Sequence, residues 1–294
     1  MSVSKSNERL IQWTFALCGA VSIFVTLGIF AVLFWETFHF FQEVPLGAFL
    51  FGTKWTPLFV QKQFGILPLI SGTLLIALIA MIIALPLGIS IAIFLREYAS
   101  SHLRRTLKPI LEILAGIPTI VYGYFALLTV TPFLQKVIPE LAGFNALSPG
   151  IVMGIMILPL SVSLSDDAIH AVPEHLRMGA YALGAKRLEV VFRVVLPAAM
   201  SGIVSAGILS ISRAIGETML VTIAAGMRPL LTLNPLGPVQ TITAYIVQVS
   251  LGDTPTGTLE YSSIFAVATV LFLCTFFLNT IAQRLRQSFQ HMYA

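Results

Sequence analysis

Two opposite charges stand four residues apart in an apolar part of the chain, at Arg213 and Glu217. An arginine inside a membrane span is unfavourable by about 2.5–3.5 kcal/mol even on the lenient insertion scale, so its presence needs a reason. At this spacing the two side chains share a helix face and can form a self-neutralising ion pair inside a bundle. Arginine also offers planar, permanently charged donors to an oxyanion in transit, while the glutamate competes for the arginine and keeps the anion from binding too tightly. Both residues are therefore candidates for an anion translocation path.

A second polar feature, the segment 166–197, lies between long apolar stretches and is predicted to be a helical hairpin. Pro173 suits the first position of a helix, and Gly184 can adopt the left-handed conformation that ends it. A second helix is then predicted to end at Leu196-Pro197. The hairpin is either an ordinary connector or a surface on which another protein docks. Apolar residues at helical spacing predict one stripe on each helix, turned away from the bilayer: Leu176, Ala180 and Leu183, then Leu188, Val191 and Val195.

The composition is that of a membrane protein. Hydrophobic residues make up 57% of the 294 positions and charged residues only 10%, whereas about a quarter of a soluble domain is charged. Six apolar segments are each long enough for a spanning helix of about 20 residues. We therefore expect an all-α, polytopic membrane protein whose six transmembrane helices lie at 11–35, 68–95, 109–134, 148–166, 198–226 and 261–283.

The basic residues predict the orientation, because lysine and arginine are retained on the cytoplasmic side during insertion. With the N-terminus inside, twelve of the 17 lysines and arginines fall in cytoplasmic segments, four fall in outer loops, and Arg213 lies in a span. Both termini and the segment 166–197 are then cytosolic. The same asymmetry accounts for the net charge of +4 without a nucleic-acid partner.

Several kinds of chemistry are not indicated by the sequence. Cys18 and Cys274 both lie in apolar spans, where free cysteines behave as small hydrophobes. His170 and His175 lack the spacing that aims two imidazoles from one helix face at a metal. The phosphate-binding pattern G-x-x-x-x-G-K-[ST] does not occur in the 294 residues. We therefore expect no enzyme activity, no metal site and no cofactor bound by this chain, so that any ATP is used by a separate ATPase.

Proline and glycine interrupt three predicted spans, at Pro86, Pro118 and Pro159. Each is tolerated as an ordinary kink in a membrane helix, but three together also fit helices that line a transport path. The outer segment 241–251 is predicted to be either a re-entrant or a surface helix. In the fifth span, small residues recur every four positions and let another helix of this chain or of a partner approach closely: Ala198, Gly202, Ala206, Ser210 and Ala214.

The hairpin resembles the "EAA" loop of bacterial ABC-importer permeases, in which a Glu-Ala-Ala, a glycine and a terminal Leu-Pro recur at these separations. Gly184 and Leu196-Pro197 match that pattern, and so does Ala180. Met178 stands where the family usually has glutamate, and Gly179 where it has the first alanine. The resemblance implies that the hairpin docks on an ATPase, with Ala180, Gly184, Leu196 and Pro197 as the coupling residues.

Nearly the whole chain is similar to the phosphate-specific ABC-importer permeases, through segments 64–74, 96–99, 116–123 and 213–219. The last segment looks like the PstC-type subunit, because Thr218 and Met219 follow the glutamate where sulfate and molybdate permeases tend to have Phe-Gly. The resemblance implies a type I ABC permease fold. Residues 1–10 are then a cytosolic N-terminus, and 11–294 form a single transmembrane domain with its core at 68–283.

The same resemblance implies a permease subunit of an ATP-driven importer that moves inorganic phosphate from the periplasm or cell exterior into the cytoplasm, across a bacterial inner membrane. It implies a heterodimer with a PstA-like permease, a PstB-like ATPase dimer, a periplasmic phosphate-binding protein and a surrounding of membrane lipid. Two alternatives stay open. One is an ABC permease for sulfate, molybdate or phosphonate, and the other is a self-sufficient secondary anion transporter.

Overall fold

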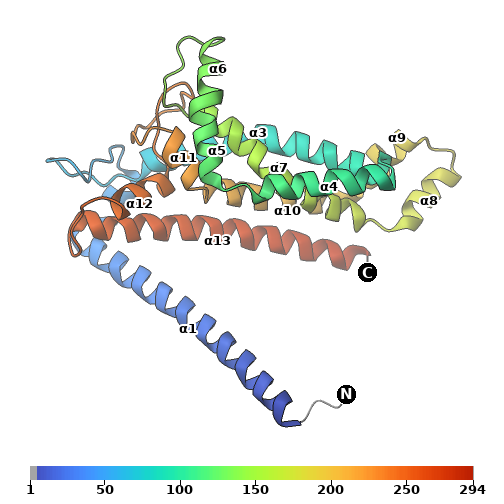
Figure 1. The fold of residues 1–294 in the computed structure, drawn as a ribbon, viewed down its shortest axis with the longest axis horizontal. Coiled ribbons are helices and arrows are strands. Elements are labelled where there is room, and N and C mark those ends of the chain that lie inside the picture. Colours follow the sequence, from blue (N-terminus) through green and yellow to red (C-terminus); the bar gives the residue numbers. More distant parts are fainter. Residues whose placement is uncertain (1–4, 294) are drawn as a thin grey trace.

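The computed structural model describes residues 5–293 and is a bundle of long helices (Figure 1). Five helices are long and apolar enough to cross a membrane on their own, at Ile11–Glu43, Leu67–Tyr98, Leu147–His170, Arg187–Ile215 and Leu259–Gln287. The bent pair Ser101–Gly116 and Thr119–Gln135 makes a sixth span when it is counted as one. The predicted all-α, polytopic fold class is confirmed.

We call the end of the bundle that carries α8 and α9 the hairpin end, and the end with α2, α11 and α12 the opposite end (Figure 1). The long helices are α1 (Lys5–Glu43), α3 (Leu67–Ile93), α7 (Leu147–His170), α10 (Leu196–Ile215) and α13 (Leu259–Tyr293). The shorter ones are α2 (Leu46–Phe51), α4 (Ser101–Gly116), α5 (Thr119–Phe125), α6 (Thr131–Gln135), α8 (Glu174–Ala182), α9 (Arg187–Val190), α11 (Met219–Ala224) and α12 (Ile242–Ser250). Three π-helical turns extend helices: η1 (Phe94–Tyr98), η2 (Ala126–Val130) and η3 (Val191–Val195).

Helices α3 and α7 form the centre of the bundle, and α10 packs on both. Glycines let these helices approach closely: a Cβ added at Gly88 of α3 would lie 2.4 Å from the hydroxyl of Ser161 in α7. A Cβ added at Gly202 of α10 would lie 2.6 Å from the Cβ of Ala168, also in α7. The small-residue stripe of the fifth span therefore meets a helix of the same chain.

Two of the three predicted interruptions leave their helices unbroken. Pro86 lies inside α3 and Pro159 inside α7, and both helices continue past them to the hairpin end. The hydroxyl of Ser90 donates to the carbonyl oxygen of Pro86 at 2.7 Å, so the helix is polar-bonded one turn after this proline. At these two sites the proline is thus accommodated inside a continuous helix.

The third span differs from the single helix predicted over 109–134. Helix α4 begins at Ser101, after a Ser100 hydroxyl that accepts from the N–H of Leu103, and Pro109 lies inside it. It ends at Gly116, and the chain then turns by 86° into α5. The cause is Pro118, which has no N–H to donate and holds the residue before it in an extended conformation.

The predicted fifth span, 198–226, is also not one helix. Helix α10 ends at Ile215, and α11 begins after a break at Gly216, Glu217 and Thr218. The N–H of Glu217 donates to the carbonyl oxygen of Ala214 at 3.1 Å, a tight turn that closes α10. The prediction that Arg213 and Glu217 share one helix face is therefore wrong, because only the arginine belongs to α10.

Helix α12 is buried at the opposite end, which rules out the surface-helix interpretation of 241–251. Tyr245 is 1% exposed, and its ring meets that of the equally buried Trp55 edge to face at 4.8 Å. The N–H of Ile242 donates to the hydroxyl of Thr73 in α3 at 3.0 Å. The segment is thus anchored to the central helix pair.

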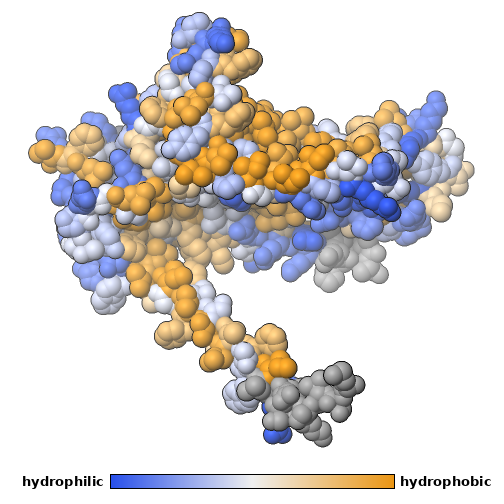
Figure 2. Space-filling view, in the orientation of Figure 1, coloured by the Kyte–Doolittle hydropathy of each residue, from blue (hydrophilic) through white to orange (hydrophobic). Residues whose placement is uncertain are grey.

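Helix α1 contacts α13 through its C-terminal part, where Thr37 and Thr269 share a hydrogen bond of 2.8 Å, and its N-terminal part diverges from the bundle (Figure 1). No residue of its most apolar 18-residue window is buried. Figure 2 shows apolar side chains along α1 and over the middle of the bundle, with hydrophilic residues gathered toward the ends. This is the distribution expected of helices that face lipid.

We predict that the hairpin end lies in the cytosol, because most lysines and arginines stand in segments on that side. Single cysteines at the exposed positions Ser101, Lys186 and Gln287, in a background without Cys18 and Cys274, should resist an impermeant thiol reagent in intact cells. In permeabilised cells all three should react.

The matched positions at the opposite end are Gln61 and Asp253, which are exposed as well. Cysteines there should react in intact cells. Labelling of the Lys186 position from outside, with none at Gln61, would reverse the orientation.

Candidate functional site

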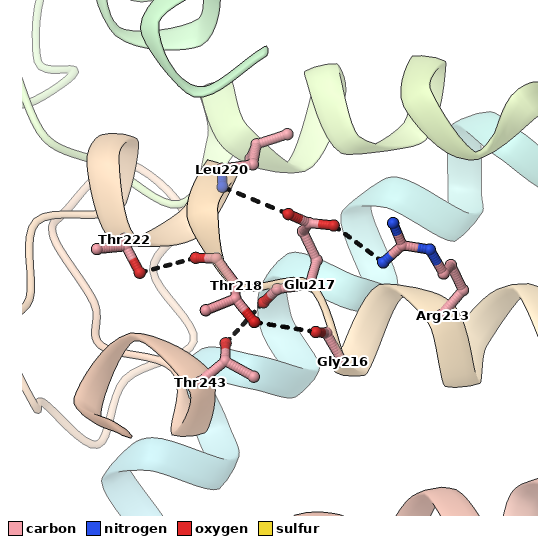
Figure 3. A network of polar contacts seen from close by, with 7 residues as sticks. All are labelled: Arg213, Gly216, Glu217, Thr218, Leu220, Thr222 and Thr243. Atoms are coloured by element: carbon pink, nitrogen blue, oxygen red, sulfur yellow. Dashed lines mark hydrogen bonds and ion pairs between the residues drawn. The ribbon is translucent and has the colours of Figure 1, made fainter. Parts of the chain in front are cut away.

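The side chains of Arg213 and Glu217 form an ion pair across the end of α10 (Figure 3). Nη1 of the arginine donates to Oε2 of the glutamate at 3.0 Å. The other carboxylate oxygen accepts a hydrogen bond from the N–H of Leu220, in the first turn of α11, at 3.4 Å. Both oxygens of this carboxylate are therefore engaged, one by a cation and one by the start of a helix.

The backbone around the glutamate is fixed as well. Its carbonyl oxygen accepts from the hydroxyl of Thr243 in α12 at 2.6 Å, and the hydroxyl of Thr218 donates to the carbonyl oxygen of Gly216 at 3.2 Å (Figure 3). Three elements, α10, α11 and α12, thus converge on the break. The site is assembled by hydrogen bonds that a straight helix could not make.

The two partners differ sharply in exposure. The side chain of Glu217 is 2% exposed, whereas that of Arg213 is 46% exposed. Within residues 5–293, the bond to Glu217 is the one hydrogen bond that this guanidinium makes. A guanidinium has five N–H donors, so Arg213 can bind a further acceptor without leaving the glutamate. Chemically, the pair is a cation that Glu217 holds in one orientation, which we call braced, and Arg213 can offer two parallel donors to an oxyanion.

Arg213 lies far from the hairpin end. Helix α9, turn η3 and α10 form one continuous helical rod from Arg187 to Ile215. At 1.5 Å per residue, Arg213 stands about 39 Å along this rod from Arg187. The second arm of the hairpin and the arginine therefore belong to one rigid element.

This rod corrects the prediction that the second hairpin helix ends at Leu196-Pro197. Both residues lie in the first turn of α10, and the helix passes through them. The π-helical turn η3 ends just before Pro197, with the N–H of Leu196 bonded to the carbonyl oxygen of Val191. This wider turn accommodates the proline, which cannot donate, without a break.

The turn of the hairpin agrees with its prediction. Gly184 has a φ of +83°, in the left-handed region, and ends the first arm after α8. Pro173 precedes α8 as its cap residue, whereas a first helical position was predicted. Asp166, the predicted start of the segment, lies inside α7, which extends to His170.

The predicted apolar stripes do not both face outward. Val191 and Val195 are 1% exposed and pack in a core cluster with α7 and the end of α3, and Leu176 and Ala180 pack against the same cluster. These residues hold the hairpin on the bundle. Each stripe keeps one exposed member, Leu183 and Leu188, and the other large apolar side chains that the hairpin exposes are Met178, Tyr181 and Phe192.

The four residues matched to the coupling loop differ in their exposure to solvent. Ala180 and Leu196 are half-buried, while Gly184 and Pro197 are exposed. Their positions fit a role in shaping the hairpin, through its turn and its join to α10. The exposed part of the hairpin carries the five apolar side chains just named.

Sequence reasoning missed a set of charged residues at the hairpin end. Asp166 is 5% exposed, and Arg104 of α4 donates to its carboxylate at 2.8 Å, with the amine of Lys108 at 3.5 Å. Glu97 is 8% exposed and pairs with Arg177 of α8 at 3.3 Å. The only sequence signal was a charge beside a span end, which membrane topology alone also predicts.

Residues 5–293 contain no group of three or more histidine, cysteine, aspartate or glutamate side chains placed to hold an ion. Cys18 and Cys274 are free and exposed on the helix surface.

The fold and the two sites define a class of membrane protein. The bundle superimposes on a bacterial ABC transporter that imports alginate, with a TM-score of 0.62 at 16% identity over 95% of this chain and 98% of the other. It also superimposes on the methionine ABC transporter MetNI in an inward-facing conformation, with a TM-score of 0.55 at 18% identity over 76% and 94% of the two chains. The fold is that of the type I ABC-importer permeases.

The chain belongs to the family described as the binding-protein-dependent transport system inner membrane component, whose model matches residues 84–291. It is 35% identical to the probable ABC transporter permease YqgH of Bacillus subtilis, over 78% of this chain and 74% of that protein. It is also 35% identical to the phosphate transport system permease PstC of Mesorhizobium japonicum, over 91% and 84% of the two chains. The PstC protein of Haemophilus influenzae is 33% identical over 91% and 89%. The protein is therefore a multi-pass membrane component of an inner-membrane transport system.

We predict that transport depends on the charge of Arg213 rather than on the bulk of the pair. Arg213→Gln should leave the carboxylate of Glu217 buried without its cation, which destabilises a protein by about 3–5 kcal/mol, so the yield of assembled complex should fall. Adding Glu217→Gln should restore the yield, because no buried charge is then left alone.

Uptake of the transported anion should stay at least about tenfold below the wild-type rate in the double variant, since a charge-assisted hydrogen bond is worth about 1.5–3 kcal/mol. Yield is measured by purification of the complex and uptake with labelled anion. Full uptake by the double variant would show that the pair is structural only.

Proposed function

We propose that this chain is the permease subunit through which inorganic phosphate moves from the periplasm or cell exterior into the cytoplasm, driven by ATP hydrolysis in partner subunits. The observation that carries the proposal is the half-exposed guanidinium of Arg213, braced by the buried carboxylate of Glu217. A planar fork of N–H donors matches the oxygens of a tetrahedral oxyanion. Relatives named as phosphate transport permeases along most of the chain support phosphate as that oxyanion.

The brace explains how such a site can release its anion. The positive charge of Arg213 is already balanced by Glu217, so an arriving phosphate meets donors in a pair without net charge. A conducting site must bind well enough to admit the ion and weakly enough to let it leave. In this proposal Arg213 and Glu217 line the translocation path, and the glutamate sets the strength of binding.

The hairpin is the proposed dock for a PstB-like ATPase dimer. Its exposed side chains form an apolar surface at the end of the molecule, which suits insertion into a groove on another protein: Met178, Tyr181, Leu183, Leu188 and Phe192. Ala180, Gly184, Leu196 and Pro197 act in coupling by fixing the shape of this surface. The chain itself binds no cofactor in this scheme, and ATP is bound and hydrolysed by the partner.

A PstA-like permease is the proposed heterodimer partner. The arm formed by α5, η2 and α6 projects from the bundle (Figure 1) and exposes a row of large apolar side chains: Ile120, Val121, Tyr124, Phe125, Leu128 and Phe133. A second permease would cover such an arm. A periplasmic phosphate-binding protein would then deliver its anion at the opposite end. This arrangement has both termini in the cytosol and treats residues 11–294 as one transmembrane domain.

Family membership argues against a self-sufficient secondary transporter, because the family consists of components of binding-protein-dependent systems. Another oxyanion is the alternative that an experiment must separate. We expect ATP hydrolysis by the purified complex to rise several-fold when phosphate-loaded binding protein is added. Binding protein loaded with sulfate or molybdate should leave it at the basal rate, and stimulation by those receptors alone would replace phosphate as the substrate.

We also predict that Gly184→Val uncouples hydrolysis from transport. Valine at a φ of +83° carries a strain of about 1–2 kcal/mol, and relief of that strain changes the angle between α8 and α9. The ATPase should bind less well, and uptake should fall about 5- to 30-fold if binding is weakened by the free energy of that strain.

The matched control is Gly257→Val. Gly257 has a φ of +82°, and like Gly184 it has open space around its Cβ position, but it lies at the opposite end of the bundle. It should carry a similar strain with normal ATPase binding. Equal behaviour of the two variants would show that the hairpin is only a connector.

A further inference from the structure

The first arm of the hairpin is attached to the bundle by partly buried apolar side chains and by one largely buried cation. No residue of α8 is fully buried, although Leu176 and Ala180 pack against the core cluster. The side chain of Arg177 is only 12% exposed. Its Nη2 atom donates to the carbonyl oxygen of Ile169 in α7 at 2.8 Å and lies 3.3 Å from the carboxylate of Glu97 in η1. One side chain of α8 thus contacts the ends of two membrane helices.

Glu97 belongs to three consecutive residues that each contact a different part of the hairpin region. Arg96 forms a hydrogen bond with His170 at the end of α7. Glu97 pairs with Arg177 of α8, and the guanidinium of Arg187 in α9 lies 4.8 Å above the ring of Tyr98. The π-helical turn η1 therefore touches α7, α8 and α9 within a single turn.

The two arms of the hairpin are held by different forces. The second arm is held by apolar burial, through Val190, Val191 and Val195 in the core cluster. The first arm has only partly buried apolar contacts, through Leu176 and Ala180, and adds to them the polar contacts of Arg177. Apolar burial is non-directional, so a small shift of the two surfaces costs little free energy. A buried ion pair is stabilising only in its own geometry, and its displacement leaves charges in apolar surroundings.

We propose that the pair of Glu97 and Arg177 is the joint that makes α8 move as one body with the ends of α3 and α7. The proposal rests on the function above, in which the hairpin docks on an ATPase. Glu97 and Arg177 are then positioning residues. They contact neither phosphate nor ATP, and they transmit the displacement of α8 to the two central helices, which are themselves packed closely through Gly88 and Ser161.

This joint also accounts for the local sequence. Arg177 immediately precedes Met178, the position at which related hairpins usually carry a glutamate. Met178 is exposed and belongs to the docking surface, while its neighbour turns inward to Glu97. Met178 therefore faces the proposed partner and Arg177 faces the membrane helices. A displacement of α8 by the partner is in this way transmitted to the ends of these helices.

A distance measurement in the assembled complex tests the joint. Spin labels are attached at His175→Cys, on α8 and outside the docking surface, and at Phe94→Cys, where α3 passes into η1, in a background without Cys18 and Cys274; both positions are exposed. In the otherwise unaltered chain the distance distribution should be narrow, and the same in the nucleotide-free and ATP-trapped states. In Arg177→Met it should broaden, and uptake should fall at least tenfold.

The single variant leaves Glu97 buried without its cation, so it can also lower the yield of the complex. The apolar pair Glu97→Leu with Arg177→Met removes that problem and should restore the yield while the distribution stays broad and uptake stays low. Arg177→Lys keeps a cation beside Glu97 and should recover part of both readouts. Lys62→Met with Glu260→Gln, which removes an ion pair at the opposite end, is the control and should leave both unchanged.

The proposal is contradicted if the apolar pair has a narrow distance distribution and full uptake. It is also contradicted if Arg177→Lys has a distribution as broad and an uptake as low as Arg177→Met. The distances are read without any binding protein. They therefore do not depend on which oxyanion is transported. If the binding-protein assay excluded phosphate, the distance measurement would still test the joint by itself.

Discussion

The buried carboxylate of Glu217 is the constraint on which the opposite end of the bundle depends. A carboxylate at 2% exposure must be paired and hydrogen-bonded, because burial of an unpaired charge costs a great deal of free energy. Arg213 and the first turn of α11 supply those partners, and the second can do so only because α10 stops before the glutamate. The hydroxyl of Thr243 then ties α12 to the same break. A half-exposed arginine, held in one orientation, is the result.

A single helical element connects that arginine with the other end of the molecule. The rod from Arg187 to Ile215 begins in the hairpin and ends at the ion pair, and the π-helical turn before Pro197 keeps it continuous. The first arm of the hairpin has a separate route, through Arg177 to the ends of α3 and α7. In the proposed mechanism, movement of the hairpin can therefore reach Arg213 directly along α10 and indirectly through the central helices that pack on it.

Much of this was predictable from the sequence where a local rule decides the structure. Apolar length predicted the spans, and the left-handed turn at Gly184 followed from the lack of a side chain. The break after Ile215 was not predictable, because it depends on partners in α11 and α12 that are distant from the helix end. The prediction that both hairpin stripes face outward was wrong for a related reason, because it too depends on distant packing partners. Periodicity finds an apolar face, but Val191 and Val195 show that this face can turn toward the protein's own core. Pro118, Pro86 and Pro159 look alike in sequence, and only the first breaks its helix.

The central claim is that phosphate crosses the membrane through this chain at the expense of ATP. Accumulation of labelled phosphate in proteoliposomes tests it most directly, with the permease and ATPase subunits in the membrane, ATP in the lumen and loaded binding protein outside. We expect phosphate to accumulate against its gradient only when both ATP and binding protein are present, with labelled sulfate excluded. Accumulation of phosphate without ATP, or of sulfate in place of phosphate, would contradict the claim.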